Sequence, residues 1–516
     1  MAVPSAAAAG ASCESLAALK LPDTSITIAQ TVAAGAFTQP VVRLDYSRSS
    51  YEKLPAFCRV AGVAKPSGDS DIHFEVWMPV SGWNRKFEGV GNGGFAGSIP
   101  YPSLGLSLSL NYAVAGTDTG HVGMDASWAP GHPEKTIDFG HRAIHETAVK
   151  AKAILRAFYG AGPERSYFAG CSNGGRQALM EAQRYPEDYD GIIAGAPANF
   201  WTHNFASFIW IMDALTTPGG YIPMAKLGTI QSATVTACDA ADGVKDGVID
   251  DPRNCHFDPS MLLCKGPEIL ACLTGSQLAA LRKIYSGPKT SQGNQISPGL
   301  FSGAEADLGG WGVWITGVAP TLSGQTYLGS QFFGSMVLEK PFWSYLDFDL
   351  ERDVQLADRK WGGVLNATDP NLKPFYDRGG KLILYHGWND AAVAPESSIE
   401  YYQSVIQTMG RENADRFVRL FMVPGMQHCA DGPGTCFFGQ GLPGAPYDPD
   451  HDVNLALERW VEKGIAPDAI IASKPLGGSA KRTRPLCAYP GVARWKGSGS
   501  TDEAGNFVCK TPDVPK

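Results

Sequence analysis

The sequence predicts an α/β fold with a large inserted domain, and three observations support this prediction. Short apolar stretches typical of strands alternate with amphipathic stretches typical of helices as far as Ala198. The alternation stops over residues 199–368, which are rich in aromatic residues, glycines and loops. It resumes at Lys381. We therefore expect one α/β core, built from residues 1–198 and 369–516, with a lid domain at residues 199–368.

The composition is that of a globular protein with long loops. Of 516 residues, 44% are hydrophobic, and there are 60 glycines and 36 prolines. The formal net charge of −8 argues against a nucleic-acid partner, because phosphate-binding surfaces are basic. No run of 18 apolar residues is present, so we expect no membrane span. Residues 1–10 are small and apolar, and they resemble the remnant of a cleaved signal peptide with an added Met.

The first third of the chain is predicted to form strands and one long helix. Residues 13–68 have a β-rich pattern with clear alternation at 25–28, and residues 71–79 form a further candidate strand. We predict a buried strand at 111–117 and an amphipathic helix at 138–158.

Two histidines four residues apart, His141 and His145, lie on one face of that predicted helix. Such a pair could bind zinc and serve a metal-dependent hydrolase. The pattern is not H-E-x-x-H, however, and no third ligand is obvious nearby. Packing or capping is the commoner role for histidines in this arrangement.

Residues 165–176 contain the pentapeptide G-x-S-x-G, with Ser172 at its centre. A β-prone run at 166–169 precedes the motif, and a helical run at 175–185 follows it. A strand, a sharp turn and a helix form the context in which this motif exposes a serine nucleophile in α/β-hydrolases. The helix N-terminus would then lie beneath a developing oxyanion. The alternative is a glycine-rich turn with an ordinary serine.

A serine nucleophile needs a base, and the base needs an acid to orient it. In α/β-hydrolases the acid and then the histidine follow the serine along the chain. The stretch 381–390 is an apolar strand that ends in a polar turn with Asp390. The apolar strand predicted at 417–423 is followed by His428. Both side chains therefore lie just past strand ends, where open α/β sheets place their sites.

The predicted lid contains an acidic loop followed by many aromatic residues. Asp239, Asp242 and Asp246, with glycines between them, offer the hard oxygen ligands that Ca²⁺ prefers. A solvated acidic turn would have the same composition. Of the aromatic residues, which more often form a core than contact a ligand, Trp314 and Phe332 are our candidates for substrate contacts.

The end of the chain is predicted to complete the core. Residues 451–464 have the pattern of an amphipathic helix that would pack on the sheet. Residues 470–509 would form a short closing module.

Two cysteines flank the candidate nucleophile and base. Cys171 directly precedes Ser172, and Cys429 directly follows His428. A disulfide between them would tie the two segments together, because such a bond holds its Cα atoms within about 7 Å. This pattern, with a cysteine before the serine, a cysteine after the histidine and Asp390 between them in the chain, resembles that of the tannase and feruloyl esterase family. The same family contains the hydrolase of mono(2-hydroxyethyl) terephthalate. The resemblance extends from about residue 13 to residue 509.

The eleven cysteines include no C-x-x-C pair, and their spacing leaves the connectivity open. The resemblance implies five disulfides and leaves Cys436 as a free thiol. These bridges are Cys13–Cys58, Cys171–Cys429, Cys238–Cys255, Cys264–Cys272 and Cys487–Cys509. Because disulfides persist in oxidising compartments, we expect a secreted or periplasmic protein.

The resemblance also implies a structural calcium ion in the acidic loop. Its ligands would be the side chains of Asp239, Asp242 and Asp246 and the carbonyl groups of Val244 and Val248.

An oxyanion hole needs one N–H group after the nucleophile and another from an early strand-to-helix loop. Asn173 would supply the first, and the glycine cluster at 91–97 the second. Gly93 and Gly94 are both candidates within that cluster, and we favour Gly93.

The function implied is that of a serine carboxylesterase that hydrolyses esters of small phenolic acids, as feruloyl esterases do, through an acyl-enzyme. A tannase acting on galloyl esters and a terephthalate half-ester hydrolase are the alternatives within the family. Between residues 302 and 350 Lys340 is the only cation, which argues against a substrate with a free carboxylate. A non-catalytic protein that binds phenolic compounds or carbohydrate is the alternative from another class.

Overall fold

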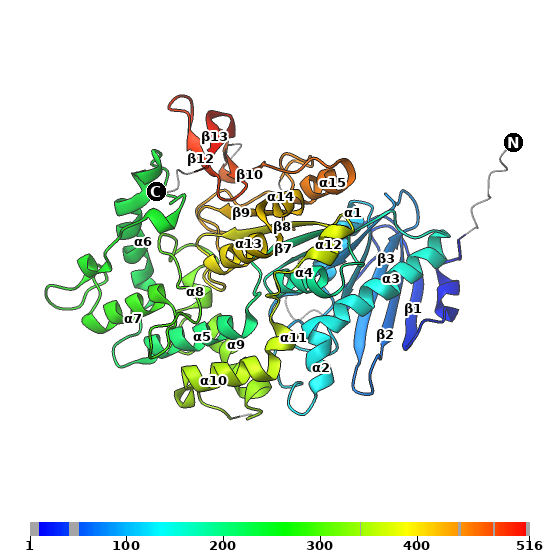
Figure 1. The fold of residues 1–516 in the computed structure, drawn as a ribbon, viewed down its shortest axis with the longest axis horizontal. Coiled ribbons are helices and arrows are strands. Elements are labelled where there is room, and N and C mark those ends of the chain that lie inside the picture. Colours follow the sequence, from blue (N-terminus) through cyan, green and yellow to red (C-terminus); the bar gives the residue numbers. More distant parts are fainter. Residues whose placement is uncertain (1–9, 41–50, 341, 442–444, 478–479, 512–516) are drawn as a thin grey trace.

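The computed structural model describes residues 10–40, 51–340, 342–441, 445–477 and 480–511. The segment predicted to be a signal-peptide remnant lies outside these residues, apart from Gly10. The described chain is built around one large sheet with helices on both of its faces (Figure 1).

The large sheet has nine strands in the order β1-β2-β3-β5-β4-β6-β7-β8-β9. The pairs from β1 to β5 are antiparallel, and the pairs from β5 through β4 to β9 are parallel. The strands span β1 Thr24–Val32, β2 Phe57–Ala64, β3 Ile72–Pro79, β4 Lys86–Val90, β5 Ala113–Thr117, β6 Arg165–Cys171, β7 Gly191–Gly195, β8 Lys381–Gly387 and β9 Val418–Val423. The α/β fold predicted from the alternating pattern is confirmed.

Fifteen α-helices occur among the described residues. They span α1 Tyr101–Ser109, α2 Pro133–Ile137, α3 Ala143–Tyr159, α4 Asn173–Arg184, α5 Trp201–Thr216, α6 Met224–Cys238, α7 Gly275–Ser286, α8 Trp311–Trp314, α9 Gly324–Gln331, α10 Leu350–Ala357, α11 Gly363–Leu365, α12 Lys373–Asp377, α13 Glu396–Met409, α14 Arg411–Phe417 and α15 Val453–Lys463. Helices α3, α4 and α13 share one hydrophobic core with one face of the sheet, and α15 packs on the other face. None of the described helices is both long enough and apolar enough to cross a bilayer.

The long helix predicted at 138–158 begins with a π-helical turn, Asp138–Arg142, and continues as α3. Gly160 ends α3 with a φ of 75°, a left-handed C-terminal cap that glycine adopts without steric cost.

The segment between β7 and β8 consists of helices joined by long loops, and its described residues add no strand to the three sheets (Figure 1). Its aromatic cluster packs against residues that follow the carboxyl ends of three parallel strands. These residues are Phe95 after β4, Ala198 after β7 and Val393 after β8. The segment therefore covers the edge of the sheet where the candidate site lies.

The closing module consists of two hairpin-like sheets, β10 Ala469–Gly477 with β11 Ala480–Cys487 and β12 Val492–Trp495 with β13 Phe507–Lys510. One of the five disulfides, Cys487–Cys509, closes this module. The other four bridges are also those implied by the resemblance, namely Cys13–Cys58, Cys171–Cys429, Cys238–Cys255 and Cys264–Cys272. Cys436 is a buried free thiol.

Candidate active site

Ser172 occupies the sharp turn between β6 and α4, with a φ of 65° and a ψ of −123°. Few residues other than glycine adopt a positive φ, and such backbone strain is frequent at catalytic nucleophiles. The flanking glycines permit the close approach of strand and helix. A Cβ atom added to Gly170 would lie 2.6 Å from the carbonyl carbon of Gly174, and one added to Gly175 would lie 2.2 Å from the Gly195 oxygen. The strand, turn and helix predicted around Ser172 are therefore present.

The three candidate triad residues form one chain of hydrogen bonds. His428 Nε2 lies 2.8 Å from Ser172 Oγ, and His428 Nδ1 lies 2.7 Å from Asp390 Oδ2. Because a carboxylate only accepts, Nδ1 carries the proton, which leaves Nε2 to accept from the serine hydroxyl. Asp390 follows β8 and His428 follows β9, so neighbouring parallel strands bring them to the same edge as Ser172.

The carboxylate of Asp390 is held on both of its oxygens. Oδ1 accepts from the backbone N–H groups of Ala392 at 2.7 Å and Val393 at 2.8 Å. Burial by itself would raise the pKa of Asp390, but His428 and His386 outweigh burial and lower the pKa below its ordinary value. Asp390 is therefore ionised at neutral pH.

His386, in β8, is a contact of the triad that the sequence reasoning missed. Its side chain is completely buried, and Nε2 lies 3.1 Å from both Asp390 Oδ2 and the Val393 carbonyl oxygen. Both neighbours are acceptors, so Nε2 donates to them. Nδ1 lies 2.7 Å from Ser398 Oγ. Its position four residues before the candidate acid, at the end of an apolar strand, was the signal in the sequence.

The Cys171–Cys429 disulfide joins the residue before the nucleophile to the residue after the base, with 6.0 Å between their Cα atoms. It crosses 258 residues of sequence, and both flanked residues belong to the triad. The bridge predicted from these two neighbours is confirmed.

The glycine loop after β4 is attached to the nucleophile turn by backbone and side-chain hydrogen bonds. Gly91 N donates to the Ala169 oxygen at 3.0 Å, and Asn92 N donates to Gln177 Oε1 of α4 at 3.0 Å. No atom lies within 4 Å of a Cβ added to Gly93, so space is open beside this residue. Asn173 is the first residue of α4, and its N–H group therefore lacks a partner within the helix.

A family model described as tannase and feruloyl esterase matches residues 58–510. The chain belongs to this family. An uncharacterized esterase of Xanthomonas campestris pv. campestris is 45% identical, over 98% of this chain and 92% of its own length. A probable feruloyl esterase B-1 of Aspergillus terreus is 33% identical, over 95% of this chain and 93% of its own length.

Solved structures place this member of the tannase and feruloyl esterase family among α/β-hydrolase-like folds. Feruloyl esterase B from Aspergillus oryzae has a TM-score of 0.89 and 29% identity, and the match covers 97% of this chain and 99% of that one. Tannin acyl hydrolase from Aspergillus niger shares the fold, with a TM-score of 0.76 and 23% identity over 95% and 92% of the two chains. The protein is a carboxylic ester hydrolase, and its substrate is an ester.

The two candidate substrate contacts of the esterase lie in different surroundings. Trp314 meets the ring of His428 edge-on, with 5.0 Å between ring centroids. Phe332 is completely buried and packs against Phe205 and Phe333 at centroid distances of 5.0 Å each. Trp314 thus borders His428, whereas Phe332 belongs to the buried aromatic cluster of the segment between β7 and β8.

Two apolar side chains that the sequence reasoning missed lie beside the glycine loop of the esterase. A Cβ added to Gly94 would lie 3.9 Å from Met124 Cε and 4.0 Å from Leu328 Cδ2. Met124 is 61% exposed, which is high for an apolar side chain. Ala126 N donates to Gln331 Oε1 at 3.1 Å and so connects the Met124 loop to helix α9, which also carries Leu328.

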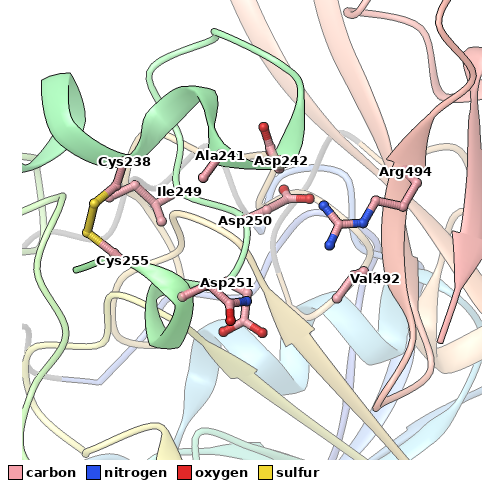
Figure 2. A pocket seen from close by; sticks show the side chains of 10 residues that line it. Cys238, Ala241, Asp242, Ile249, Asp250, Asp251, Cys255, Val492 and Arg494 are labelled. Atoms are coloured by element: carbon pink, nitrogen blue, oxygen red, sulfur yellow. A yellow bond between two sulfur atoms is a disulfide. The ribbon is translucent and has the colours of Figure 1, made fainter. Parts of the chain in front are cut away.

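The acidic loop of the esterase follows α6 and is closed by the Cys238–Cys255 disulfide (Figure 2). Asp239 Oδ1 accepts from the N–H groups of Asp246 at 3.2 Å and Gly247 at 3.0 Å. Asp246 also pairs with Arg484, which neutralises part of the charge.

The donor chemistry of this loop fits Ca²⁺. Burial raises the pKa of Asp242, and the carboxylates of Asp246 and Asp239 raise it further. A cavity of about 250 Å³ adjoins the loop, and Asp250 lies there between Asp242 and Arg494 (Figure 2). Within the described part of the chain, no group of three His, Cys, Asp or Glu side chains is arranged to hold a metal ion. The loop therefore offers hard oxygen atoms of the kind that Ca²⁺ prefers, but its described side chains do not form a ready-made metal site.

The two histidines of the predicted helix have packing partners in the esterase. His141 Nδ1 lies 2.7 Å from the Tyr185 hydroxyl, and His145 Nδ1 lies 2.6 Å from Asp188 Oδ2. The His145 ring also stacks on Tyr185, with centroids 3.9 Å apart. These contacts favour the packing role over a zinc site.

Proposed function

We propose that this esterase hydrolyses esters of small phenolic acids through an acyl-enzyme on Ser172. One observation carries the proposal, namely the unbroken hydrogen-bond chain from Ser172 Oγ through His428 to Asp390. This arrangement lets one imidazole remove the serine proton and return it to the leaving group.

In the acylation step, His428 Nε2 takes the hydroxyl proton while Ser172 Oγ forms a bond to the ester carbonyl carbon. The tetrahedral oxyanion accepts hydrogen bonds from the N–H groups of Asn173 and Gly93, each worth about 3 kcal/mol of barrier in comparable enzymes. As the alcohol leaves, its oxygen takes the proton from His428. Water then attacks the acyl-enzyme with the same base, and the acid product and free Ser172 result.

His386 serves this mechanism as a positioning residue. By donating to Asp390 Oδ2 it fixes the carboxylate oxygen that also accepts from His428. The backbone donors at Ala392 and Val393 hold the second oxygen. The carboxylate is thus held in place before the imidazolium forms, which is the preorganisation that electrostatic catalysis requires.

The side chains around the triad support the proposal that the acyl group of the substrate is aromatic. Trp314 borders His428, and Met124 and Leu328 border the glycine loop. Aromatic and apolar side chains of this kind pack well on a planar acid. The relatives named feruloyl esterase B agree with this substrate class.

The decisive experiment measures initial rates on methyl ferulate, methyl gallate and mono(2-hydroxyethyl) terephthalate. We expect the highest kcat/KM on methyl ferulate and no hydrolysis by Ser172→Ala. Preference for the gallate ester would make the protein a tannase. Preference for the half-ester would contradict the argument from the single cation, Lys340, between residues 302 and 350. Turnover by Ser172→Ala would refute the mechanism itself.

We also propose that the acidic loop binds one structural Ca²⁺ and that the protein works outside the cytoplasm. The calcium proposal is supported by the charges of Asp239 and Asp246, which raise the pKa of Asp242 and would be balanced by a cation. The localisation is supported by five disulfides, which persist in oxidising compartments.

A further inference from the structure

A second cavity, separate from the triad, lies at the seam between the core and the lid. Its volume is about 340 Å³, and it is enclosed by the start of α5, the loop at 295–298 and helix α13. None of Ser172, Asp390 and His428 lines it. Its floor nevertheless connects to the site, because Ala198 N, at one wall, donates to the Ser172 carbonyl oxygen at 3.2 Å.

The wall of this cavity contains a buried amide with an unused acceptor. Asn199 is only 4% exposed, and its Oδ1 has no hydrogen-bond partner. Buried polar atoms are almost always paired, and an unpaired one is destabilising. Asn204, one turn into α5, is 7% exposed and lines the same cavity. Two amides therefore offer donors and acceptors to a polar ligand.

The charge of the lining indicates a neutral ligand. No Lys or Arg lines the cavity, so nothing there would compensate an anion. His203 is already engaged, by Asp358 Oδ2 at 3.0 Å and by the Ile296 carbonyl oxygen at 2.7 Å. Glu400, on the rim, is the one carboxylate among the lining residues, and burial and Glu396 raise its pKa. Its carboxyl group pairs well with hydroxyl groups whether it is ionised or protonated.

One aromatic ring and two aliphatic side chains give the cavity an apolar surface. Phe200 is 38% exposed and stacks on His203 with 3.6 Å between ring centroids. Ile296 and Pro298 extend this surface on the lid side. A ligand that matches the lining thus has hydroxyl groups at its edges and an apolar face, a combination typical of sugar rings.

We propose that this cleft is a binding site for a neutral carbohydrate, held by Asn199, Asn204 and Glu400 with a sugar face against Phe200. The site spans core and lid, so an occupied cleft would also tie the two together. The proposal does not depend on the catalytic role of Ser172, because a sugar without an ester group would bind equally well.

The test is isothermal titration calorimetry, which measures the affinity of the Ser172→Ala protein for xylotriose and for cellotriose. Citrate serves as the anionic comparison. We expect at least one trisaccharide to bind and citrate not to bind. Asn199→Leu and Glu400→Gln should each weaken binding about tenfold, the effect of losing one good hydrogen bond. Gln403→Ala, an exposed change on the same helix α13, should leave the affinity unchanged.

Thermal unfolding distinguishes a ligand-binding amide from a structural one. Because Asn199 Oδ1 is unpaired, Asn199→Leu should leave the melting temperature unchanged or raise it, while saccharide affinity falls. The proposal is overturned if neither trisaccharide binds at millimolar concentration. It is equally overturned if binding survives both Asn199→Leu and Glu400→Gln, or if citrate binds as tightly as the sugars.

Discussion

At the scale of single residues, Ser172 illustrates how neighbours stabilise a strained position. A positive φ at a residue other than glycine costs about 1–3 kcal/mol. The surroundings compensate with three backbone hydrogen bonds, from Ser172 N to Gly195 O and from Arg176 N and Ala198 N to Ser172 O. The hydroxyl is thereby fixed next to His428 before substrate arrives.

Ser172→Ala should lower kcat to less than about a thousandth of wild type while the fold is retained, because the turn keeps its backbone contacts. Initial rates and the melting temperature together check this. Ser109→Ala, an exposed change on α1, is the control and should keep full activity. Residual hydrolysis above that level would point to another nucleophile.

The positioning role of His386 is tested by a pair of variants. His386→Leu removes the donor to Asp390 Oδ2, which takes away one of the causes that lower the pKa of Asp390. The carboxylate then attracts the His428 proton more strongly. The acid limb of the kcat/KM profile should therefore move to higher pH, and kcat should fall about tenfold or more with little change in KM.

His386→Gln places an N–H donor near the position of Nε2 and should restore most of the rate and of the pH profile. If His386 only packed against its neighbours, His386→Leu would keep more activity than His386→Gln. Alternatively, both variants would lose the same activity without a shift of the acid limb. Melting temperatures of the two variants identify any loss that is due to unfolding.

At the scale of elements, the Cys171–Cys429 bridge joins the end of β6 to the loop after β9, two strands that are not neighbours in the sheet. The double variant Cys171→Ala with Cys429→Ala should lower kcat by about 10- to 100-fold, because small displacements of a triad are costly.

The control for this change is Cys264→Ala with Cys272→Ala, which opens a bridge across only 8 residues of the lid. In the chain-entropy model the loss of stability is about 5.5 kcal/mol for the long bridge and about 2.5 kcal/mol for the short one. We expect the short-bridge variant to keep its kcat. Equal rates for both double variants would show that the active-site bridge has no role in positioning.

The acidic loop provides a second test at this scale. Chelation of Ca²⁺ should lower the melting temperature by a few degrees, and added Ca²⁺ should restore it, because an ion that binds only the folded state stabilises it. Asp242→Asn should abolish this dependence, whereas Asp377→Asn, an exposed change on α12, should preserve it. An unchanged melting temperature on chelation of the wild-type protein would contradict the calcium proposal.

At the scale of the whole molecule, the net charge of −8 affects which esters approach the site. A negative field repels anionic substrates, and salt screens it over about 10 Å at 0.1 M ionic strength. The kcat/KM for mono(2-hydroxyethyl) terephthalate should therefore rise with ionic strength relative to that for methyl ferulate. A constant ratio across the salt series would show that local contacts outweigh the overall charge.

Features that depend on a local pattern can be predicted from the amino-acid sequence alone. The strand, turn and helix around Ser172 follow from a β-prone run, glycines and a helical run within about a dozen residues. The strands before Asp390 and His428 follow in the same way. The family resemblance supplied the disulfide pairing, because cysteine spacing alone permits many connectivities.

Contacts between segments that are far apart in the chain depend on the tertiary structure. Met124 and Leu328 meet at the glycine loop across about two hundred residues, and Phe332 packs in the lid core rather than beside His428. Asn199 lines one cavity together with the loop at 295–298 and α13, and its buried Oδ1 has no hydrogen-bond partner there. Local propensities fix strands, turns and helices, whereas the neighbours of a side chain depend on how those elements pack.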